Sequence, residues 1–349
     1  MKAKRVVIVG GVGGGASAAA RVRRLDEFAH ITVFEKGPDV SFSNCALPYT
    51  FSDVIDQPDD VILKTPEQFE QQYQIDVQVN TTVVAVDARA KTVTIKRTGR
   101  HDTATVPYDI LILSPGARPI VPTTIAGVAQ PNVMTIRNVQ DVRGIQAYIV
   151  AHDVHDVAIV GGGFIGLEMA ENLQQTGHRV TVVEAAKHVL GTLDDDFAQM
   201  VHKELYDHGV QVILHDGVAA IETTRVRLVS GRTIAAQLVI MAIGVTPETE
   251  LAVQAGCQLG TTGGIKVDHH YQTSVTAIYA VGDAIEVTNR LTRQPARLAL
   301  AFPAQMQARH LVDQLYGKMP HYQGVIGSQV LHLFTLNVAS TGLTAADCD

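Results

Sequence analysis

One cysteine, Cys45, lies among residue types that can activate a thiol, in the segment SFSNCALPY at residues 41–49. The hydroxyl and amide groups that precede it offer hydrogen bonds, and Pro48 is compatible with the first turn of a helix. A cysteine just ahead of a helix is stabilised as the thiolate, which is the reactive form. The alternative is a small, buried hydrophobic residue. The neighbouring residues favour a reactive cysteine.

A glycine-rich turn in the middle of the chain has the spacing of a dinucleotide-binding site. Gly161, Gly163 and Gly166 match G-x-G-x-x-G directly after an apolar run, where a strand would lead into a helix. This pattern allows a tight turn, close approach of a pyrophosphate and close packing of helix and strand. Glu184 is placed to accept the hydroxyls of an adenosine ribose and would repel a 2′-phosphate. We therefore predict NADH in preference to NADPH; the alternative is a tight turn that binds nothing.

A second turn near the N-terminus departs from this pattern. Gly10 and Gly15 hold its first and last positions, but Val12 stands where the middle glycine would be. The turn is followed by an acidic residue, Glu35, which could bind another adenosine ribose. Additional glycines that could let the turn adjust are Gly11, Gly13 and Gly14.

The elements that must position these residues form a repeat. Each glycine turn follows an apolar strand (residues 6–9 and 157–160) and precedes a helix and a second strand that ends in an acid, so we expect two dinucleotide-binding units. A further strand, Ala277–Val281, ends in Gly282-Asp283; Asp283 could bind cofactor hydroxyls or cap the next segment. The other expected elements are strands at Ile75–Val79, Val83–Val86, Thr92–Lys96, Ile110–Leu113, Leu238–Ile243 and Val330–Val338, and a helix at Ala301–Tyr316 stopped by Gly317 and Pro320.

Composition limits the classes of function. The 349 residues carry a net charge of −7, which argues against binding to nucleic acid or to an anionic membrane surface. The chain has three cysteines, and their spacing fits neither a disulfide framework nor a zinc site, so we expect a reducing cytoplasm and no metal. We expect structural roles for Cys257, as part of a helix end, and for Cys348, in a loose C-terminus. We predict neither a signal peptide nor a membrane span.

Taken in order, these motifs resemble the pyridine nucleotide-disulfide oxidoreductases over roughly residues 4–346. The resemblance is carried by the first glycine turn, SFSNCALPY, YDILILSPGA (108–117), GGGFIGLEMAE (161–171), MAIGVTPET (241–249) and IYAVGDA (278–284). The cysteine segment is most similar to the branch that reduces coenzyme A disulfide, which includes NADH-dependent persulfide reductases. The resemblance implies an α/β protein with two Rossmann-like dinucleotide-binding domains: an FAD domain (1–115 and 245–325) interrupted by an NAD domain (116–244), and then a remnant of a C-terminal dimerisation domain (326–349).

The resemblance also implies roles for individual residues. Cys45 would be the redox cysteine, and Ser41, Asn44, Ser17, Arg21 and Arg24 would contact a coenzyme A-like thiol; the alternative for the two arginines is a solvated helix face. Phe164 would cover the flavin until the nicotinamide arrives, and Glu168 would lie near both rings. FAD would be bound by Gly10, Val12, Gly13, Gly14, Gly15, Glu35, Lys36, Val83, Ser114, Pro115, Gly116, Asp283, Leu300 and Ala301. NADH, with NADPH as the alternative, would be bound by Gly161, Gly163, Phe164, Ile165, Gly166, Glu168, Glu184 and Gly244.

The chain departs from the family at the substrate and at the C-terminus. Tyr73, Gln305 and Met306 stand where family members usually have basic residues, and each lost charge-assisted contact could weaken coenzyme A binding by about 1.5–3 kcal/mol. The family is homodimeric through a third domain that is mostly missing here. The expected function is reduction of coenzyme A disulfide or a related small disulfide or persulfide. The alternatives are an NADH oxidase or peroxidase that cycles through a Cys45 sulfenic acid, and a flavin-binding remnant with little turnover.

Overall fold

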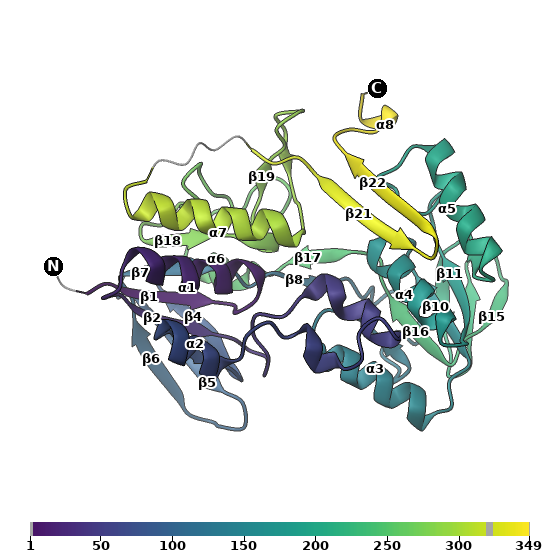
Figure 1. The fold of residues 1–349 in the computed structure, drawn as a ribbon, viewed down its shortest axis with the longest axis horizontal. Helices are drawn as coiled ribbons and strands as arrows, with labels where there is room; N and C mark the ends of the chain where they lie inside the picture. Colours follow the sequence, from purple (N-terminus) through teal and green to yellow (C-terminus); the bar gives the residue numbers. More distant parts are fainter. Residues whose placement is uncertain (1–2, 319–323, 349) are drawn as a thin grey trace. The chain divides into compact units, whose positions relative to one another are not determined.

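The computed structural model describes residues 3–318 and 324–348, and the chain divides into two compact units (Figure 1). The first unit comprises Met1–Ser43, Ile62–Arg118 and Pro247–Ile326. The second comprises Asn44–Val61, Pro119–Thr246 and Gly327–Asp349. Short strands β8 (Ala117–Pro119) and β17 (Val245–Pro247) lie where the chain passes from one unit to the other.

The first unit is built on a five-stranded parallel sheet with the order β18-β7-β1-β2-β3. Its central strands, β1 and β7, consist almost wholly of buried β-branched and leucine residues, as expected for strands covered on both faces. The sheet strands are β1 (Arg5–Val9), β2 (His30–Phe34), β3 (Asp76–Gln78), β7 (Ile110–Leu113) and β18 (Ile278–Ala280).

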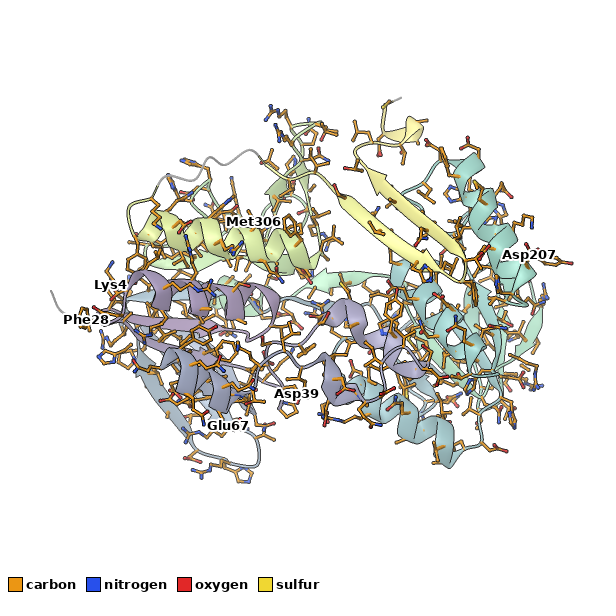
Figure 2. The ribbon with its side chains drawn as sticks, in the orientation of Figure 1. Lys4, Phe28, Asp39, Glu67, Asp207 and Met306 are labelled. Carbon is orange, nitrogen blue, oxygen red and sulfur yellow. The ribbon has the colours of Figure 1, made fainter. Side chains whose placement is uncertain are left out.

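Two long helices of this unit, α1 (Gly13–Leu25) and α7 (Ala301–Leu315), pack against each other (Figure 1). At one end of this helix pair the Tyr316 hydroxyl donates to Asp26 at 3.0 Å. The ammonium of Lys4, which is labelled in Figure 2, lies 4.9 Å from the centre of the Tyr316 ring. The remaining elements of the unit are α2 (Pro66–Tyr73), the antiparallel strands β4 (Thr81–Asp87), β5 (Thr92–Arg97) and β6 (Thr103–Pro107), α6 (Glu250–Gln254), η3 (Gly282–Ala284), β19 (Val287–Thr288) and β20 (Pro295–Ala296).

The second unit repeats this plan. Its parallel sheet has the order β12-β11-β10-β16-β9, so β10, β11, β12 and β16 correspond to β1, β2, β3 and β7 of the first unit. Each unit also carries a three-stranded antiparallel sheet. The elements are β9 (Val133–Met134), α3 (Val139–Ala151), β10 (Asp156–Val160), α4 (Phe164–Gln175), β11 (Arg179–Val183), α5 (Asp195–Asp207), β12 (Gln211–Ile213), β13 (Val218–Ile221), β14 (Arg225–Leu228), β15 (Thr233–Ala235) and β16 (Leu238–Met241).

Two further parts of the chain belong to the second unit. Residues 44–61 form the short 3₁₀ helices η1 (Asn44–Phe51) and η2 (Pro58–Val61). The C-terminal segment forms a hairpin of β21 (Ser328–Leu333) and β22 (Leu336–Thr341), followed by α8 (Ala345–Cys348). The prediction of one strand over Val330–Val338 is therefore wrong, because Phe334 adopts a φ of 52° and turns the chain back on itself.

Most predicted elements are present with small shifts at their ends. The strand Ile110–Leu113 is confirmed as predicted, and the predicted helix Ala301–Tyr316 ends one residue earlier, at Leu315. The predicted Leu238–Ile243 strand ends at Met241. Pro320, the second predicted stop signal, lies outside the described residues. Cys257 is buried but follows α6 rather than ending it, and the exposed Cys348 lies in α8 rather than in a loose terminus.

Candidate functional sites

The first glycine turn connects β1 to α1. Gly10 has a φ of +95°, and a Cβ there would come within 2.1 Å of the Ser114 carbonyl oxygen, so only glycine fits. A Cβ on Gly15 would come within 1.8 Å of the Gly10 carbonyl oxygen, which shows how closely the helix packs on the turn. Val12 precedes the helix as its N-cap, and a Cβ on Gly13 would meet nothing within 4 Å. The first helical residue therefore faces open space.

The second glycine turn, between β10 and α4, has the same geometry. Gly161 has a φ of +108°, and a Cβ on it would lie 2.5 Å from the Ala242 carbonyl oxygen. A Cβ on Gly166 would lie 2.1 Å from the Gly161 carbonyl oxygen, whereas one on Gly163, the N-cap, would meet nothing within 4 Å. The turn is thus tight where the backbone packs on itself and open where the amides at the helix N-terminus are presented. Both turns therefore fit the pyrophosphate of a dinucleotide.

The two predicted ribose-binding acids are held in the same way. The Glu35 carboxylate accepts from the Gly11 and Gly37 amides, both at 2.9 Å. The Glu184 carboxylate accepts from the amides of Gly162, at 2.7 Å, and Ala186, at 2.8 Å. Since a carboxylate has about four acceptor positions, each acid is oriented by its turn and still has capacity for the hydroxyls of a ribose.

The carboxyl edge of the first sheet carries four more of the residues predicted to bind a flavin nucleotide. Ser114, Pro115 and Gly116 follow β7, and Asp283 follows β18 in η3. The Ser114 hydroxyl lies 2.7 Å from where a Gly14 Cβ would be, so this serine, the first turn and the β7 end lie together. The strand order changes direction between β1 and β7, which is where open α/β sheets bind their ligands.

The remaining predicted residues of the first unit are more scattered. Val83 is buried in β4, where it pairs with Ile95, and the exposed Lys36 lies 3.8 Å from the partly buried Glu248 in an ion pair. Leu300 is the N-cap of α7 and Ala301 is its exposed first residue. Ser41 has a φ of 49° and donates its amide to the Gly11 carbonyl at 2.9 Å.

The arginines predicted to bind phosphates lie on α1 but are not equivalent. The Arg21 guanidinium donates to the Asp313 carboxylate on α7 at 2.9 Å, and both side chains are largely buried. Arg24 is exposed and Ser17 is half-buried. Of the residues that depart from the family pattern, Tyr73 packs on Phe69 in α2 with ring centres 6.1 Å apart, and Met306 projects from α7 (Figure 2). Arg24 is therefore the more accessible of the two cations.

Cys45 is the second residue of η1, and its side chain is exposed. The expectation that it stands just ahead of a helix is corrected, because the polar segment before it has already entered the 3₁₀ helix at Asn44. The Asn44 side chain donates to the Arg137 carbonyl at 3.1 Å, which fixes the start of the helix. The first amides of a 3₁₀ helix also lack intrahelical acceptors, so a thiol in its first turn still lies near partial positive charge.

Tyr49 and Glu171, for which no role was predicted from the sequence, lie in the second unit with Glu168. Tyr49 and Glu168 lie close enough for each to shift the pKa of the other. Burial, followed by the negative charge of Glu171, raises the pKa of Glu168 to about 7, although Tyr49 opposes this shift. Burial, followed by the charge of Glu168, raises the pKa of Tyr49 to about 12. The sequence shows that Glu168 and Glu171 are three residues apart on one predicted helix. It does not show that Tyr49, from another helix, lies near them.

The other predicted nicotinamide residues lie around the same turn. Phe164 and Ile165 open α4; Phe164 is half-buried, and Ile165 is exposed. Gly244 follows β16 with a φ of +109°, and its carbonyl accepts from the Ile120 amide at 3.0 Å. In the part of the chain that the structure describes, no group of three or more histidine, cysteine, aspartate or glutamate residues could hold a metal ion. No helix among the described residues is long and apolar enough to cross a membrane.

The comparison with family models decides the membership of this chain. Residues 4–308 match the model described as pyridine nucleotide-disulphide oxidoreductase. The chain belongs to this family. Two curated relatives support this conclusion. It is 31% identical over 341 residues to the coenzyme A disulfide reductase of Staphylococcus haemolyticus, covering 97% of this chain and 77% of that protein. It is 35% identical over 346 residues to the NADH oxidase of Methanocaldococcus jannaschii, covering 98% and 76%.

Solved structures of family members are also similar. The reduced CoADR-RHD protein of Bacillus anthracis is 42% identical with a TM-score of 0.96, covering 99% of this chain and 63% of that one. The NAD-dependent persulfide reductase of A. fulgidus is 32% identical with a TM-score of 0.95, covering 99% and 65%. An FAD-dependent member from Desulfovibrio vulgaris is 31% identical with a TM-score of 0.82, covering 99% and 79%. This family member thus spans less than two thirds of the first two solved chains.

Proposed function

We propose that this oxidoreductase uses FAD and NADH to reduce a small disulfide or persulfide through Cys45. The observation that carries the proposal is an exposed cysteine thiol at the start of η1 in a chain with two glycine turns of matching geometry. One turn serves each dinucleotide: FAD at the turn of residues 10–15 with Glu35, and NADH at the turn of residues 161–166 with Glu184. The proposed cofactor domains are then residues 1–115 with 245–325 for FAD and residues 116–244 for NADH, except that residues 44–61 of the first range pack in the second unit.

The residues of the two glycine turns fit both cofactors, and each group of residues has a separate role. When bound, FAD supplies the two-electron chemistry that links hydride donation to thiol formation. The glycine turns bind pyrophosphate with main-chain amides, and the two acids orient the riboses. Phe164, at the start of α4, would cover the flavin until the nicotinamide displaces it. Cys45 holds the substrate sulfur covalently as a mixed disulfide between the two halves of the reaction.

The substrate class is a small disulfide or persulfide, with coenzyme A disulfide as one candidate. Coenzyme A carries several negative charges, but Arg21 is already paired with Asp313, and Tyr73, Gln305 and Met306 offer no positive charge. Ser17, Arg24, Ser41 and Asn44 remain as polar contacts. The relatives include both a coenzyme A disulfide reductase and a persulfide reductase. Because few cations are available for the phosphates, we expect the KM for a disulfide to depend only weakly on whether it carries the coenzyme A phosphates.

The test is turnover by the FAD-loaded chain. Under anaerobic conditions, NADH oxidation is followed with coenzyme A disulfide, a small uncharged disulfide and a persulfide as separate acceptors, using Cys45→Ser as the matched variant. The proposal requires acceptor-dependent oxidation that Cys45→Ser abolishes while NADH still reduces the flavin. Intact mass spectrometry should show a thiol adduct that is absent from the variant.

The second candidate is an NADH oxidase or peroxidase, favoured by the 35% identity to such an oxidase. Rapid use of oxygen or peroxide, with no turnover of disulfide or persulfide, would establish it in place of the first proposal. A protein that binds flavin but turns over none of these acceptors would be a flavin-binding remnant. We propose that the protein forms a homodimer, as the resemblance to the family implies.

A further inference from the structure

The loop after β11, residues 185–190, closes one side of the second glycine turn. The Glu184 carboxylate accepts from the Ala186 amide at 2.8 Å, so the chain turns around this acid as it leaves β11. The Leu190 amide then donates to the Gly162 carbonyl at 2.8 Å, and a Cβ on Gly162 would lie 2.6 Å from the loop. The loop therefore lies against the turn, beside the acid that is proposed to bind the ribose.

Two basic residues of this loop, Lys187 and His188, share one carboxylate. The Lys187 ammonium lies 2.6 Å from one oxygen of Asp195 and 2.8 Å from the other. The His188 Nε2 lies 3.2 Å from the first of these oxygens. Asp195 belongs to the first turn of α5, so an acid of the helix holds both basic residues of the loop.

The contacts of His188 fix its protonation state. Its side chain is 8% exposed, and its Nδ1 lies 2.7 Å from the Val189 carbonyl oxygen, which can only accept. Nδ1 therefore carries a hydrogen, and Nε2 requires a second hydrogen to bond to the Asp195 carboxylate. The neighbouring His202 accepts from the Val189 amide at 3.2 Å and is neutral, and burial followed by the charge of His188 lowers its pKa.

The buried imidazolium makes this cluster different from an isolated surface ion pair. Lys187 and Asp195 are each more than half exposed, and such a pair on its own is easily separated by solvent. The Asp195 carboxylate, however, is also held by the buried His188 ring, which its own contact with the Val189 carbonyl keeps in place. Asp195 is therefore a fixed anion, and the Lys187 ammonium that contacts both of its oxygens is fixed with it.

The position of Lys187 matters for a ligand that carries a 2′-phosphate. In dinucleotide-binding folds, an acid after the second strand accepts from the ribose hydroxyls, whereas a nearby cation accommodates a 2′-phosphate. Lys187 lies three positions after Glu184, on the loop that turns around it. In this structure the Lys187 charge is already neutralised by Asp195. A 2′-phosphate would therefore meet the Glu184 charge without a cation to offset it.

We propose that Asp195 is a specificity-determining residue, which favours NADH by holding Lys187 away from a 2′-phosphate. The inference rests on the proposed function, in which the second turn binds NADH. Asp195 acts on the dinucleotide only through Lys187, so it is a positioning residue. Loss of the Asp195 charge should therefore help a ligand with a 2′-phosphate, and it should do so only while Lys187 is present.

The test measures binding of the adenosine half of the dinucleotide, so it does not depend on turnover. The FAD-loaded chain, whose first turn is occupied, is titrated in a calorimeter with adenosine 2′,5′-bisphosphate and with adenosine 5′-monophosphate. Asp195→Asn should lower the Kd of the bisphosphate about tenfold and leave the Kd of the monophosphate within about twofold. The KM for NADPH should fall by a similar factor while kcat stays unchanged.

Two further variants separate a released lysine from the mere loss of a negative charge. Asp196 is the next residue of the same helical turn, and its carboxylate accepts from the Phe197 amide at 3.0 Å, so Asp196→Asn is the matched control. It should change the Kd of the bisphosphate by less than about twofold. In a Lys187→Met background, Asp195→Asn should also change this Kd by less than about twofold, because no ammonium remains to be released.

The outcomes distinguish this inference from the proposed function. Equal gains from Asp195→Asn and Asp196→Asn, or a tenfold gain that persists in the Lys187→Met background, overturn the inference. An unchanged Kd for the bisphosphate in Asp195→Asn, with normal binding of the monophosphate, refutes the inference alone. If neither the monophosphate nor NADH binds to the FAD-loaded chain, the second turn is not the NADH site and the proposed function fails as well.

Discussion

Replacement of Glu184 by glutamine tests how the second turn distinguishes NADH from NADPH. Glu184→Gln removes the charge and keeps one of the two oxygens, so it can still accept from one of the Gly162 and Ala186 amides, which now donate to different carboxylate oxygens at 2.7 and 2.8 Å. A 2′-phosphate on a ribose bound by this carboxylate would lie about 4 Å from it. At an effective dielectric constant of about 20, two unit charges at this distance repel by about 4 kcal/mol.

Solvent reduces this repulsion, because the Glu184 side chain is only partly buried. If about half of this repulsion remains, ~2 kcal/mol, the ratio of kcat/KM for NADH to kcat/KM for NADPH should fall about 30-fold in the variant. The assay is steady-state reduction of a fixed disulfide with each dinucleotide at two ionic strengths. Salt screens the repulsion, so the preference of the unmodified protein should weaken with salt while that of the variant stays constant.

Glu35→Gln is the matched control, because Glu35 makes the same pair of contacts in the first turn, both at 2.9 Å. It should leave the NADH to NADPH ratio unchanged and weaken FAD retention instead. An unchanged ratio in Glu184→Gln, or an equal change in Glu35→Gln, would refute the assignment of the second turn to the nicotinamide dinucleotide.

Three further predictions concern the turns, the acidic pair and the phosphate-binding face. Gly166→Ala should destabilise the protein by about 1–3 kcal/mol in denaturant unfolding, because its Cβ would lie 2.1 Å from a backbone oxygen, whereas Gly163→Ala should change stability by less than ~0.5 kcal/mol and raise the Kd for NADH; equal stabilities would contradict this. The folded pKa of Glu168, about 7, exceeds its ordinary value of 4.5, so the native state holds the extra proton and its stability contribution is lost as pH rises from 4.5 through 7. Glu168→Gln should therefore gain up to ~3 kcal/mol relative to the unmodified protein between pH 5 and pH 8, and a parallel pair of stability curves would exclude this. Asp313→Asn should release Arg21 from its ion pair and lower the KM for coenzyme A disulfide severalfold without changing that for a small uncharged disulfide; an equal effect on both would show that the α1 face does not bind phosphates.

The repeat itself could be predicted because each of its parts depends on neighbouring residues. The strand Ile110–Leu113 is a continuous apolar run, and the turn glycines occupy positions where a Cβ would strike the backbone. These signals are local: they depend on the pattern of side chains within one strand, turn or helix. The α/β class and the two-unit plan follow from them.

The parts that could not be predicted depend on contacts between distant segments. Tyr49 and Glu168 are 119 positions apart, and only the packing of η1 on α4 brings them together. The pairing of Arg21 with Asp313 likewise requires α1 and α7 to lie side by side, so a phosphate-binding arginine and an arginine in an ion pair look the same in the sequence. The hairpin at 328–341 was not predicted because its turn consists of Phe334 and Thr335, whereas a tight turn is usually signalled by glycine or asparagine.

The turn of the C-terminal hairpin covers two acidic residues of the second unit and donates hydrogen bonds to them. Its turn donates the Phe334 amide to Glu171 and the Thr335 amide and hydroxyl to Glu204, each at 2.7 Å, and the Phe334 ring stacks on His208 with ring centres 4.1 Å apart. Without this turn Glu171 would lose both a hydrogen-bond donor and its cover from water. Burial is the largest cause of the raised pKa of Glu171, and the Phe334 amide and His332 of the same hairpin act in the opposite direction. The hairpin therefore both covers Glu171 and supplies it with a donor, so it belongs to the packing of α4 and α5 and is not a separate appendage.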